Sequence, residues 1–333
     1  MNAQTLCGVR ILGTGSAAPE GRLTNADFEK MLDTSDEWIV QRTGIRERRV
    51  LDLDKGNGLT LAHEALQNAI DAAGIQGSEI DLVICATVTS VMTCPSTAAR
   101  VAAEVGATGA AAFDVGAACS GFVYAINLAD SIVRAGRAKT VAVIGVDAMT
   151  SIIDYADRTC SILFGDAAGA VILRADPNPE LGCIYQHMGA DGSGWHALYI
   201  PRYEKDIPAC DSENKTRLGC LRMNGKEVFK FAVTKFREVI EDALAKTNLQ
   251  PADISQFVCH QSNIRIIDAA RERIGLDPSQ VYVNIDKYGN SSAGSVPLCL
   301  DQLWRAGKIT PGKPFVLVAF GGGLTWASSV WRI

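Results

Sequence analysis

The chain contains an internal repetition, and this feature restricts the possible folds more than any other. Residues 75–85 ("IQGSEIDLVIC") align with residues 249–259 ("LQPADISQFVC") at an offset of 174. A second block aligns at an offset of 171, and its members are Ser120, Asp130, Arg134, Ala135 and Gly136 with Ser291, Asp301, Arg305, Ala306 and Gly307. Two blocks in the same order predict two copies of one structural unit, related by a pseudo-twofold axis.

Short apolar runs alternate with amphipathic segments along both copies. Runs such as 139–149, 281–286 and 313–323 predict strands, and 59–73 and 228–245 predict helices. Strands separated by helices are typical of an α/β protein whose sheets pack between helices. The Pro- and Asn-rich segment 176–180 predicts the boundary between an N-terminal half, 1–176, and a C-terminal half, 177–333. Residues 202–220 are polar and predict a long loop that could act as a lid.

Charge and cysteine usage exclude several classes of protein. The 32 basic and 37 acidic side chains give a net charge of −5, so no global field attracts nucleic acid or an anionic membrane. The N-terminal stretch lacks the pattern of a signal peptide, and no apolar run approaches the roughly 18 residues of a membrane span. The 10 cysteines form no CxxC pair, which disfavours a disulfide framework or a zinc site. We expect a cytoplasmic protein without a metal.

Cys119 lies in "GAACSGF", where an apolar strand is predicted to turn into a helix. Gly116 and Gly121 allow a tight turn and a close approach of neighbouring groups. The N-terminus of the following helix is expected to lower the pKa of the Cys119 thiol by about one unit, and so to raise its thiolate fraction. The alternative is a small buried packing residue, the usual place of a free cysteine.

Three further positions could act with Cys119. His260 ends the apolar run "QFVCH", although a histidine there could simply be hydrogen-bonded in the core. Asn290, in "KYGNSSAGSVP", could be a turn residue, but the offset of 171 places it directly over Cys119. Gly321–Gly323 in "AFGGGLTW" could present backbone N–H groups to an oxyanion, or form a plain turn. The other histidines, to which no role is assigned, are His63, His187 and His196.

A thiolate, an imidazole, an amide and an oxyanion donor at strand ends are suited to acyl transfer through a thioester. The chain closely resembles the β-ketoacyl-acyl carrier protein synthase III family nearly from end to end. The motifs that carry the resemblance are "DTSDEWIVQRTGIRERR", "GAACSGF", "LFGDAAGAV", "MNGKEVFKFAV", "CHQSNIRI", "YGNSSAGSVP" and "AFGGGLTW". The resemblance implies the thiolase fold, a five-layer αβαβα arrangement of two related halves, and a homodimer. It also implies the condensation that initiates fatty acid synthesis.

The resemblance assigns catalytic roles by motif. Cys119 would be acylated by an acyl-CoA starter, and His260 and Asn290 would stabilise the enolate formed when malonyl-acyl carrier protein loses carbon dioxide. The backbone N–H groups of Cys119 and Gly322 would form the oxyanion hole. The two supporting residues implied are Phe320, which would shield the site, and Asn263, which would orient His260. No cofactor is implied, because coenzyme A enters as a thioester substrate.

The resemblance also implies binding residues. Trp38 and Arg158 would hold the adenine of coenzyme A between them, and Arg42 would approach its phosphates. Asn224 and Phe229 would line the pantetheine channel. The candidates for a basic docking patch for the acidic carrier protein are Lys230, Arg265, Arg271 and Arg273. Cys94, just before "PST", replaces an aromatic residue that often narrows the acyl pocket from the partner subunit, so starters larger than acetyl become plausible.

Four alternatives remain. A specialised condensing enzyme of secondary metabolism, like the type III polyketide synthases, would use CoA thioesters alone with the same Cys, His and Asn. A degradative thiolase would carry a second cysteine near the C-terminal glycines, and "AFGGGLTW" has none. A papain-like protease would carry a "CGSCW"-type signature, which is missing. A non-catalytic binding protein would be expected to have lost one of the three polar residues.

Overall fold

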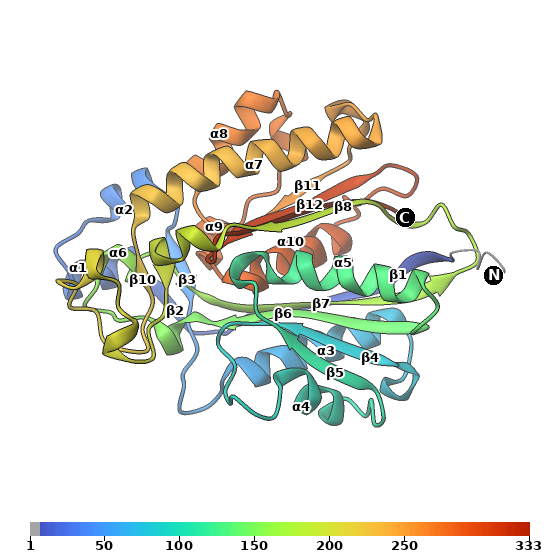
Figure 1. Ribbon diagram of the computed structural model, residues 1–333, viewed down its shortest axis with the longest axis horizontal. Helices are drawn as coiled ribbons and strands as arrows, with labels where there is room; N and C mark the ends of the chain where they lie inside the picture. The colour runs from blue at the N-terminus through green and yellow to red at the C-terminus, as the bar shows by residue number, and fades with distance from the viewer. Residues whose placement is uncertain (1–6) are drawn as a thin grey trace.

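The computed structural model describes residues 7–333. The predicted N-terminal half and the stretch without a signal-peptide pattern both begin at residue 1, so their first six residues lie outside the described residues. Two sheets form the centre of the molecule (Figure 1). The first has the order β1 (Gly8–Ala17), β7 (Asp166–Asp176), β6 (Thr140–Ala148), β4 (Leu82–Ala86) and β5 (Ala111–Val115). The second has the order β8 (Gly182–Ala190), β13 (Thr325–Arg332), β12 (Phe315–Gly321) and β11 (Phe257–Cys259).

The two sheets repeat one topology. In the first sheet, β1 and β7 are antiparallel, β7 and β6 are antiparallel, and β6 and β4 are parallel. The same sequence of directions joins β8, β13, β12 and β11. The aligned blocks 75–85 and 249–259 end in β4 and β11, which occupy equivalent places. The internal repetition therefore corresponds to two sheets of matching strand order.

Within residues 7–333, the second sheet has no equivalent of the edge strand β5. The prediction of a strand at 281–286 is wrong, because only Val281 pairs, through one isolated bridge to Phe257. The chain then leaves the sheet: the backbone N–H of Asn284 donates to the Gln261 side chain, and the short helix α9 (Ile285–Tyr288) begins. A side-chain acceptor thus replaces the backbone partner that a strand would supply.

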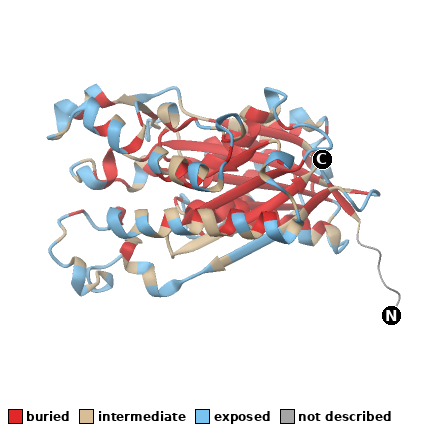
Figure 2. Ribbon diagram, turned by 90° about the horizontal axis from the view of Figure 1, so that it is seen from above, coloured by how far each residue is buried: buried red, intermediate tan, exposed pale blue. Residues whose placement is uncertain are grey.

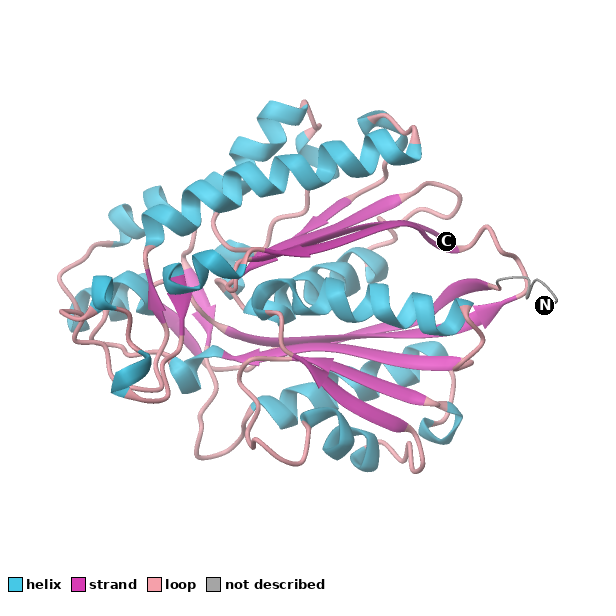
Figure 3. Cartoon of the chain, viewed as in Figure 1, coloured by secondary structure: helices cyan, strands magenta, loops and turns pink. Residues whose placement is uncertain are grey.

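Helices form three layers around the two sheets (Figures 1 and 3). The outer layers are α3 (Gly58–Ala73) with α4 (Thr97–Glu104) on the first sheet, and α7 (Gly225–Thr247) with α8 (Ile264–Ile274) on the second. Between the sheets lie α5 (Gly121–Arg134) and α10 (Ser295–Arg305). Figure 2 shows the buried strands at the centre and the exposed faces of the outer helices. The predicted αβαβα order is confirmed.

Two carboxylates on the inner helices join the halves. Asp130 of α5 accepts a hydrogen bond from the backbone N–H of Cys183 in β8, at 3.1 Å. Asp301 of α10 accepts from the hydroxyls of Thr14 and Ser16 in β1, at 2.7 and 2.6 Å. Each carboxylate also pairs with the arginine four residues later in its helix. The Asp and Arg positions that repeat in the sequence therefore contact the edge strand of the opposite half.

Smaller elements gather at one end of the layers, at the left of Figure 1. They are β2 (Arg22–Thr24), α1 (Asn25–Met31), α2 (Asp36–Thr43), β3 (Glu47–Arg49), α6 (Arg158–Ser161), β9 (Leu198–Tyr199) and β10 (Arg222–Met223). The segment 202–220 is a loop apart from two single 3-10 turns. Among residues 7–333, no helix has the length and apolar character to cross a membrane, and no group of three His, Cys, Asp or Glu side chains could hold a metal ion.

Candidate active site

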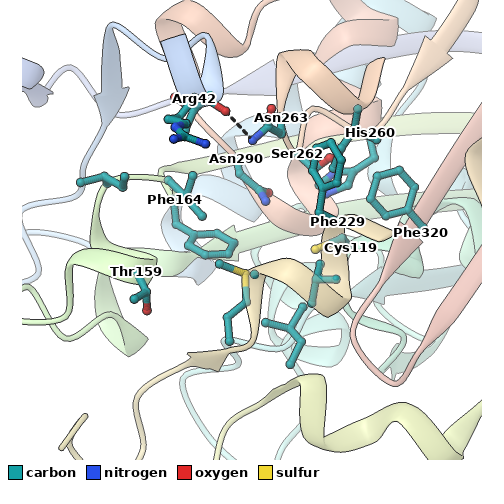
Figure 4. A pocket seen from close by; sticks show the side chains of 18 of the residues that line it. Arg42, Cys119, Thr159, Phe164, Phe229, His260, Ser262, Asn263, Asn290 and Phe320 are labelled. Carbon is teal, nitrogen blue, oxygen red and sulfur yellow. Dashed lines mark hydrogen bonds between the residues drawn. The ribbon is translucent and has the colours of Figure 1, made fainter. Parts of the chain in front are cut away.

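One cavity, of about 470 Å³, receives side chains from both halves of the chain. Cys119, His260 and Asn290 all line it, together with Phe320 (Figure 4). The other lining residues are Trp38, Arg42, Thr43, Thr159, Ile162, Leu163, Phe164, Leu198, Met223, Gly225, Val228, Phe229, Phe231, Ser262, Asn263, Ile266 and Gly321. Most of this second set is apolar, so the cavity offers a few polar groups on a largely hydrophobic wall. Such a composition is typical of small-molecule sites.

Cys119 lies on a tight turn between β5 and α5. Ala118, just before it, has φ 46°, a left-handed conformation that is costly for a residue with a Cβ atom. The Ser120 hydroxyl fixes the turn through Thr325 Oγ1 at 2.6 Å and the Ala117 carbonyl at 2.8 Å. Gly321 lies against it, and a Cβ atom there would be 2.7 Å from the Cys119 backbone nitrogen. The turn is therefore strained at Ala118, is held by hydrogen bonds of Ser120, and is in close contact with β12 at Gly321.

The thiol of Cys119 is buried, with 7% of the residue exposed. Burial raises the pKa of Cys119 to about 12. The predicted net lowering of this pKa is therefore wrong. The reason is that α5 begins at Gly121, and its modest dipole effect does not offset the cost of removing a thiolate from water. A hydrogen bond from the Ser292 side chain acts in the opposite direction to burial.

Asn290 presents its amide as a hydrogen-bond donor. Its Oδ1 accepts the backbone N–H of Ser292 at 2.9 Å. Its own backbone groups bond to Leu163 and Gly165, which join its turn to the segment after α6. Because the oxygen is engaged, the Nδ2 group is the part of the amide left for a ligand in the cavity. Only 5% of Asn290 is exposed, so this donor operates in a dry environment.

His260 follows β11 and is 1% exposed. Its backbone N–H donates to the Val318 carbonyl, and its ring meets Phe320 edge-on at a centroid distance of 5.5 Å. Burial lowers the pKa of His260 to about 3, so the imidazole is neutral. Its Nδ1 lies 2.7 Å from the Ser295 hydroxyl. The contacts therefore give the ring an orienting partner that the sequence analysis did not identify.

The repetition relates the turns of Cys119 and Asn290 differently from the prediction. Ala118 and Ser292 share the rare positive φ, 46° and 48°, and are separated by 174 residues. Cys119 therefore corresponds to Ala293, and the superposition of Cys119 on Asn290 is wrong. The offset falls to 171 only beyond the turns, because α5 has 14 residues and α10 has 11. The two turns do contact each other across the pseudo-twofold axis, as expected.

A buried carboxylate that sequence reasoning missed supports the turn that follows Asn290. Asp147, at the end of β6, is fully buried, and burial raises its pKa. It accepts backbone N–H groups from Val88, Thr89 and Ala293 at 2.9, 3.2 and 3.1 Å. It therefore ties the loop after β4 to the turn after Asn290. In the sequence, "VIGVDAM" shows only an apolar strand with one acid, which does not reveal this role.

The predicted coenzyme A residues lie partly at the cavity. The Arg42 and Arg158 guanidiniums stack on the Trp38 ring at 5.9 and 5.6 Å from its centroid. A base held between Trp38 and Arg158 needs two contact distances, about 7–8 Å. An adenine can therefore enter only if Arg158 moves away from Trp38. Phe229 lines the cavity, whereas Asn224 does not, because its side chain caps the N-terminus of α7.

The contacts of Asn263 differ from those expected. Its Nδ2 donates to the Arg42 carbonyl at 3.0 Å (Figure 4), and its Oδ1 caps the N-terminus of α8. Its side-chain bonds thus join α8 to α2, and the orienting contact to His260 comes from Ser295 instead. Gly322 follows β12 and is not among the residues that line the cavity, whereas the neighbouring Gly321 is.

The predicted docking residues lie on the two outer helices of the second half. Arg265 stacks on the Phe229 ring at 5.5 Å, which places one cation beside the cavity wall. Arg271 pairs with Asp268 at 3.2 Å. Lys230 is on α7 and Arg273 is in the last turn of α8.

Cys94 is exposed in the loop between β4 and α4 and does not line the cavity of its own chain.

Comparisons with known proteins show which family this chain belongs to. Sequence models described as "3-Oxoacyl-[acyl-carrier-protein (ACP)] synthase III" and its "C terminal" part match residues 113–192 and 244–333. A β-ketoacyl-[acyl-carrier-protein] synthase III of Xanthomonas campestris is 46% identical, over 97% of this chain and 98% of that protein. The chain belongs to the β-ketoacyl-[acyl-carrier-protein] synthase III family.

Solved structures extend the similarity to the whole fold of this synthase III family member. The 3-oxoacyl-[acyl-carrier-protein] synthase III of Aquifex aeolicus has a TM-score of 0.90 and 40% identity, over 98% of this chain and 100% of that one. A priming β-ketosynthase of the R1128 polyketide pathway also has a TM-score of 0.90, with 34% identity over 99% and 98% of the two chains. The predicted family, thiolase-like fold and condensing acyltransferase class are confirmed.

Proposed function

We propose that the protein condenses an acyl-CoA starter with malonyl-acyl carrier protein, with loss of carbon dioxide, to give a β-ketoacyl-acyl carrier protein. This reaction initiates fatty acid synthesis. The observation that carries the proposal is the convergence of Cys119, His260 and Asn290 on one cavity. Family membership supports the same reaction.

In the first half-reaction, the Cys119 sulfur attacks the thioester carbonyl of the acyl-CoA. The carbonyl oxygen becomes an oxyanion, and the backbone N–H groups of Cys119 and Gly322 are the proposed donors to it. Collapse of this intermediate expels the coenzyme A thiolate, which takes the proton that the thiol lost. Burial holds most of the thiol protonated, so deprotonation is part of the barrier to this step.

In the second half-reaction, the malonyl thioester carbonyl lies between Asn290 and His260. Its oxygen gains negative charge as the carboxylate leaves, and neutral donors that strengthen with this charge lower the barrier. The geometry supports Asn290 Nδ2 as one donor, because Oδ1 is bonded to Ser292. The pKa of about 3 supports a neutral His260 as the other.

The enolate carbon then attacks the acyl-Cys119 thioester. A new carbon–carbon bond forms, the carbon–sulfur bond breaks, and the departing Cys119 thiolate takes one proton from water to return as a thiol. Phe320 lies edge-on to His260 and is 4% exposed, which supports its proposed role in shielding the site. Asn263 is proposed to support the site indirectly, by holding α8 against α2.

Substrate binding is proposed to follow the length of the cavity. Trp38 and Arg158 would take the adenine of coenzyme A after Arg158 moves, and Arg42 would contact the phosphates. Phe229 would line the channel, and Asn224 would fix the start of α7. The acidic carrier protein is proposed to dock on the basic residues of α7 and α8, namely Lys230, Arg265, Arg271 and Arg273.

The starter and the assembly are linked proposals. β5 is an edge strand without a partner on its outer side among residues 7–333, and it exposes 37% of Phe113. Val91 and Met92, in the nearby loop that carries Cys94, are 45% and 48% exposed. A second copy covering this apolar edge would form a homodimer and bring Cys94 towards the partner's acyl pocket. We propose that the small Cys94 side chain admits starters larger than acetyl.

Three further assignments belong to this proposal. Coenzyme A and the carrier protein act as substrates, and no metal or organic cofactor takes part. All ten cysteines are unpaired, which supports a reducing compartment such as the cytoplasm. The two halves, 1–176 and 177–333, are proposed as the duplicated units, with Cys119 in the first and His260 and Asn290 in the second.

Reconstitution with purified acyl carrier protein tests the function. The protein, an acyl-CoA and malonyl-acyl carrier protein should give the β-ketoacyl-carrier product, carbon dioxide and free coenzyme A in equal amounts. Omission of any substrate should stop product formation. If the carrier product is absent while both substrates are intact, the proposed function is wrong.

A second candidate function is condensation in secondary metabolism. The observation that favours it is the similarity of this chain to the R1128 priming β-ketosynthase, an enzyme of a polyketide pathway. In its type III polyketide synthase-like form, the enzyme would accept malonyl-CoA and reject malonyl-acyl carrier protein. A comparison of the two extender substrates at equal concentration decides between them. Preference for the carrier-bound malonyl group supports fatty acid initiation.

A further inference from the structure

The Ser295 hydroxyl occupies an unusual position behind His260. It lies 2.7 Å from His260 Nδ1 and 3.0 Å from the Ser292 carbonyl oxygen. The backbone N–H of Gln261 points to it at 3.5 Å. Both Ser295 and His260 are 1% exposed, so bulk water does not compete for these contacts. Nδ1 is therefore engaged, and Nε2 is the ring nitrogen left for a ligand in the cavity.

Counting protons shows that Ser295 decides what Nε2 can do. A hydroxyl carries one proton, and a neutral imidazole carries one N–H. If Ser295 donates to the Ser292 carbonyl, Nδ1 must carry the ring proton, and Nε2 can only accept. If Ser295 donates to Nδ1, Nε2 carries the proton and can donate. The direction of one hydroxyl thus fixes the tautomer of His260.

We propose that Ser295 is a positioning residue for His260: its hydroxyl donates to Nδ1 and keeps the ring proton on Nε2, facing the cavity. This inference rests on the proposed function, in which an enolate oxygen needs a donor from His260. The distances favour this direction. At 3.0 Å, the Ser292 carbonyl is at the long end for an O–H···O bond, which is commonly about 2.7–2.8 Å, and Nδ1 lies closer to the hydroxyl, at 2.7 Å.

Negative charge on the substrate strengthens the same arrangement. As the enolate oxygen draws the Nε2 proton towards itself, the ring becomes more electron-rich, and Nδ1 becomes a better acceptor for Ser295. Donation from the Ser295 hydroxyl therefore grows when it is needed. No proton is transferred from Ser295 in this step, so its effect should be confined to the reaction that forms the enolate.

Two substitutions and one matched control separate this role from a structural one. Ser295→Ala removes the hydroxyl, and Ser295→Thr keeps it. The control is Ser291→Ala in the same turn. Ser291 is also 1% exposed, and its hydroxyl has no hydrogen-bond partner among the residues that the structure describes. All variants are compared with the wild type by thermal unfolding before their activity is measured.

The first readout is the ¹⁵N spectrum of histidine-labelled protein, with the His260 signals assigned by their loss in His260→Gln. The chain has 4 histidines, so the spectrum is simple. The wild type should show a protonated Nε2 and an unprotonated Nδ1 that accepts a hydrogen bond. Ser295→Ala should move the Nδ1 signal to the position of an unbonded nitrogen or produce some Nδ1–H tautomer. A protonated Nδ1 in the wild type overturns the proposal.

The second readout compares the two half-reactions. In Ser295→Ala, malonyl decarboxylation should fall by about 10- to 100-fold, less than the about 10²- to 10³-fold expected for loss of the donor itself. Acylation of Cys119 by acyl-CoA should change by less than about threefold, because that step does not use His260 as a donor. Ser295→Thr should restore decarboxylation to within about threefold, and Ser291→Ala should match the wild type within about twofold.

Three results would contradict the proposal. The first is that Ser295→Ala decarboxylates malonyl substrates at the wild-type rate. The second is that Ser295→Ala loses both half-reactions equally. The third is that Ser295→Thr loses as much decarboxylation as Ser295→Ala although its unfolding midpoint equals that of the wild type. A wild type that neither acylates Cys119 nor decarboxylates malonyl substrates would instead refute the proposed function. The ¹⁵N spectrum would still report the direction of the Ser295 hydrogen bond in that case.

Discussion

Asn290→Asp is the substitution that examines the enolate site most sharply. The change preserves the shape of the side chain, and one oxygen can still accept the backbone N–H of Ser292, which Oδ1 now accepts at 2.9 Å. The cavity-facing Nδ2 donor becomes an oxygen. Asn290→Ala is the matched control, because it removes the donor without adding a charge.

The expected magnitudes follow from the burial of this position. Loss of one preorganised donor costs about 10²- to 10³-fold in rate, which is the expectation for Asn290→Ala. An ionised carboxylate about 3 Å from the enolate oxygen adds repulsion of up to about 5 kcal/mol at an effective dielectric constant of 20. Because Asn290 is 5% exposed, the introduced carboxyl should have a raised pKa. Once protonated, it becomes a donor again.

The assay is carbon dioxide release from malonyl-acyl carrier protein between pH 5.5 and 8. The wild type should be nearly flat over this range, because the pKa of His260 is about 3 and its ring stays neutral. Asn290→Asp should be slower than Asn290→Ala at pH 8 and should accelerate as the pH falls, by up to tenfold per unit. Asn290→Ala should stay flat. Identical profiles for the two variants, or a wild-type rate in either, would refute the reasoning.

Three further predictions concern stability, reactivity and binding. Asp147→Ala should lower the free energy of unfolding by about 2–6 kcal/mol in urea, since the backbone N–H groups of Val88 and Ala293 lose their acceptor, whereas that of Thr89 keeps a second one in Thr87; a loss below about 1 kcal/mol would contradict this. The rate of Cys119 alkylation should rise about tenfold per pH unit up to pH 10 without a plateau, because the pKa of Cys119 is about 12. A plateau of this rate near pH 7 would show that the thiolate is already formed, against this prediction. Trp38→Ala should raise the KM for acyl-CoA by about 5- to 30-fold with little change in kcat, because the ring that stacks with Arg158 is lost; an unchanged KM would place the adenine elsewhere.

The sequence predicted the layers well because the repetition is visible in short, well-defined blocks. The motif "IDLVIC" and its counterpart end in equivalent strands, and the Asp and Arg pairs end equivalent helices. The alignment failed at the turns, where Cys119 corresponds to Ala293. Between the turns and the matched helix ends, α5 is three residues longer than α10. Residue identity alone does not show where in the alignment this gap belongs.

The site residues show a similar division. The positions of Cys119, His260 and Asn290 could be predicted, because each follows a recognisable strand or turn. Their electrostatics could not, because the pKa of Cys119 depends on burial that arises only when two halves of the chain pack together. Ser295 and Asp147 were missed for the same reason, since a serine in a turn and an aspartate in a strand acquire their roles from residues distant in sequence.

The central claim is that Cys119 carries the acyl group. Intact-protein mass spectrometry after incubation with a panel of acyl-CoAs, with the wild type beside Cys119→Ala, tests it most directly. We predict that each accepted starter adds one acyl mass to the wild type and none to the variant, and that starters larger than acetyl are among those accepted. An adduct of equal size on both proteins, or on neither, would contradict the account.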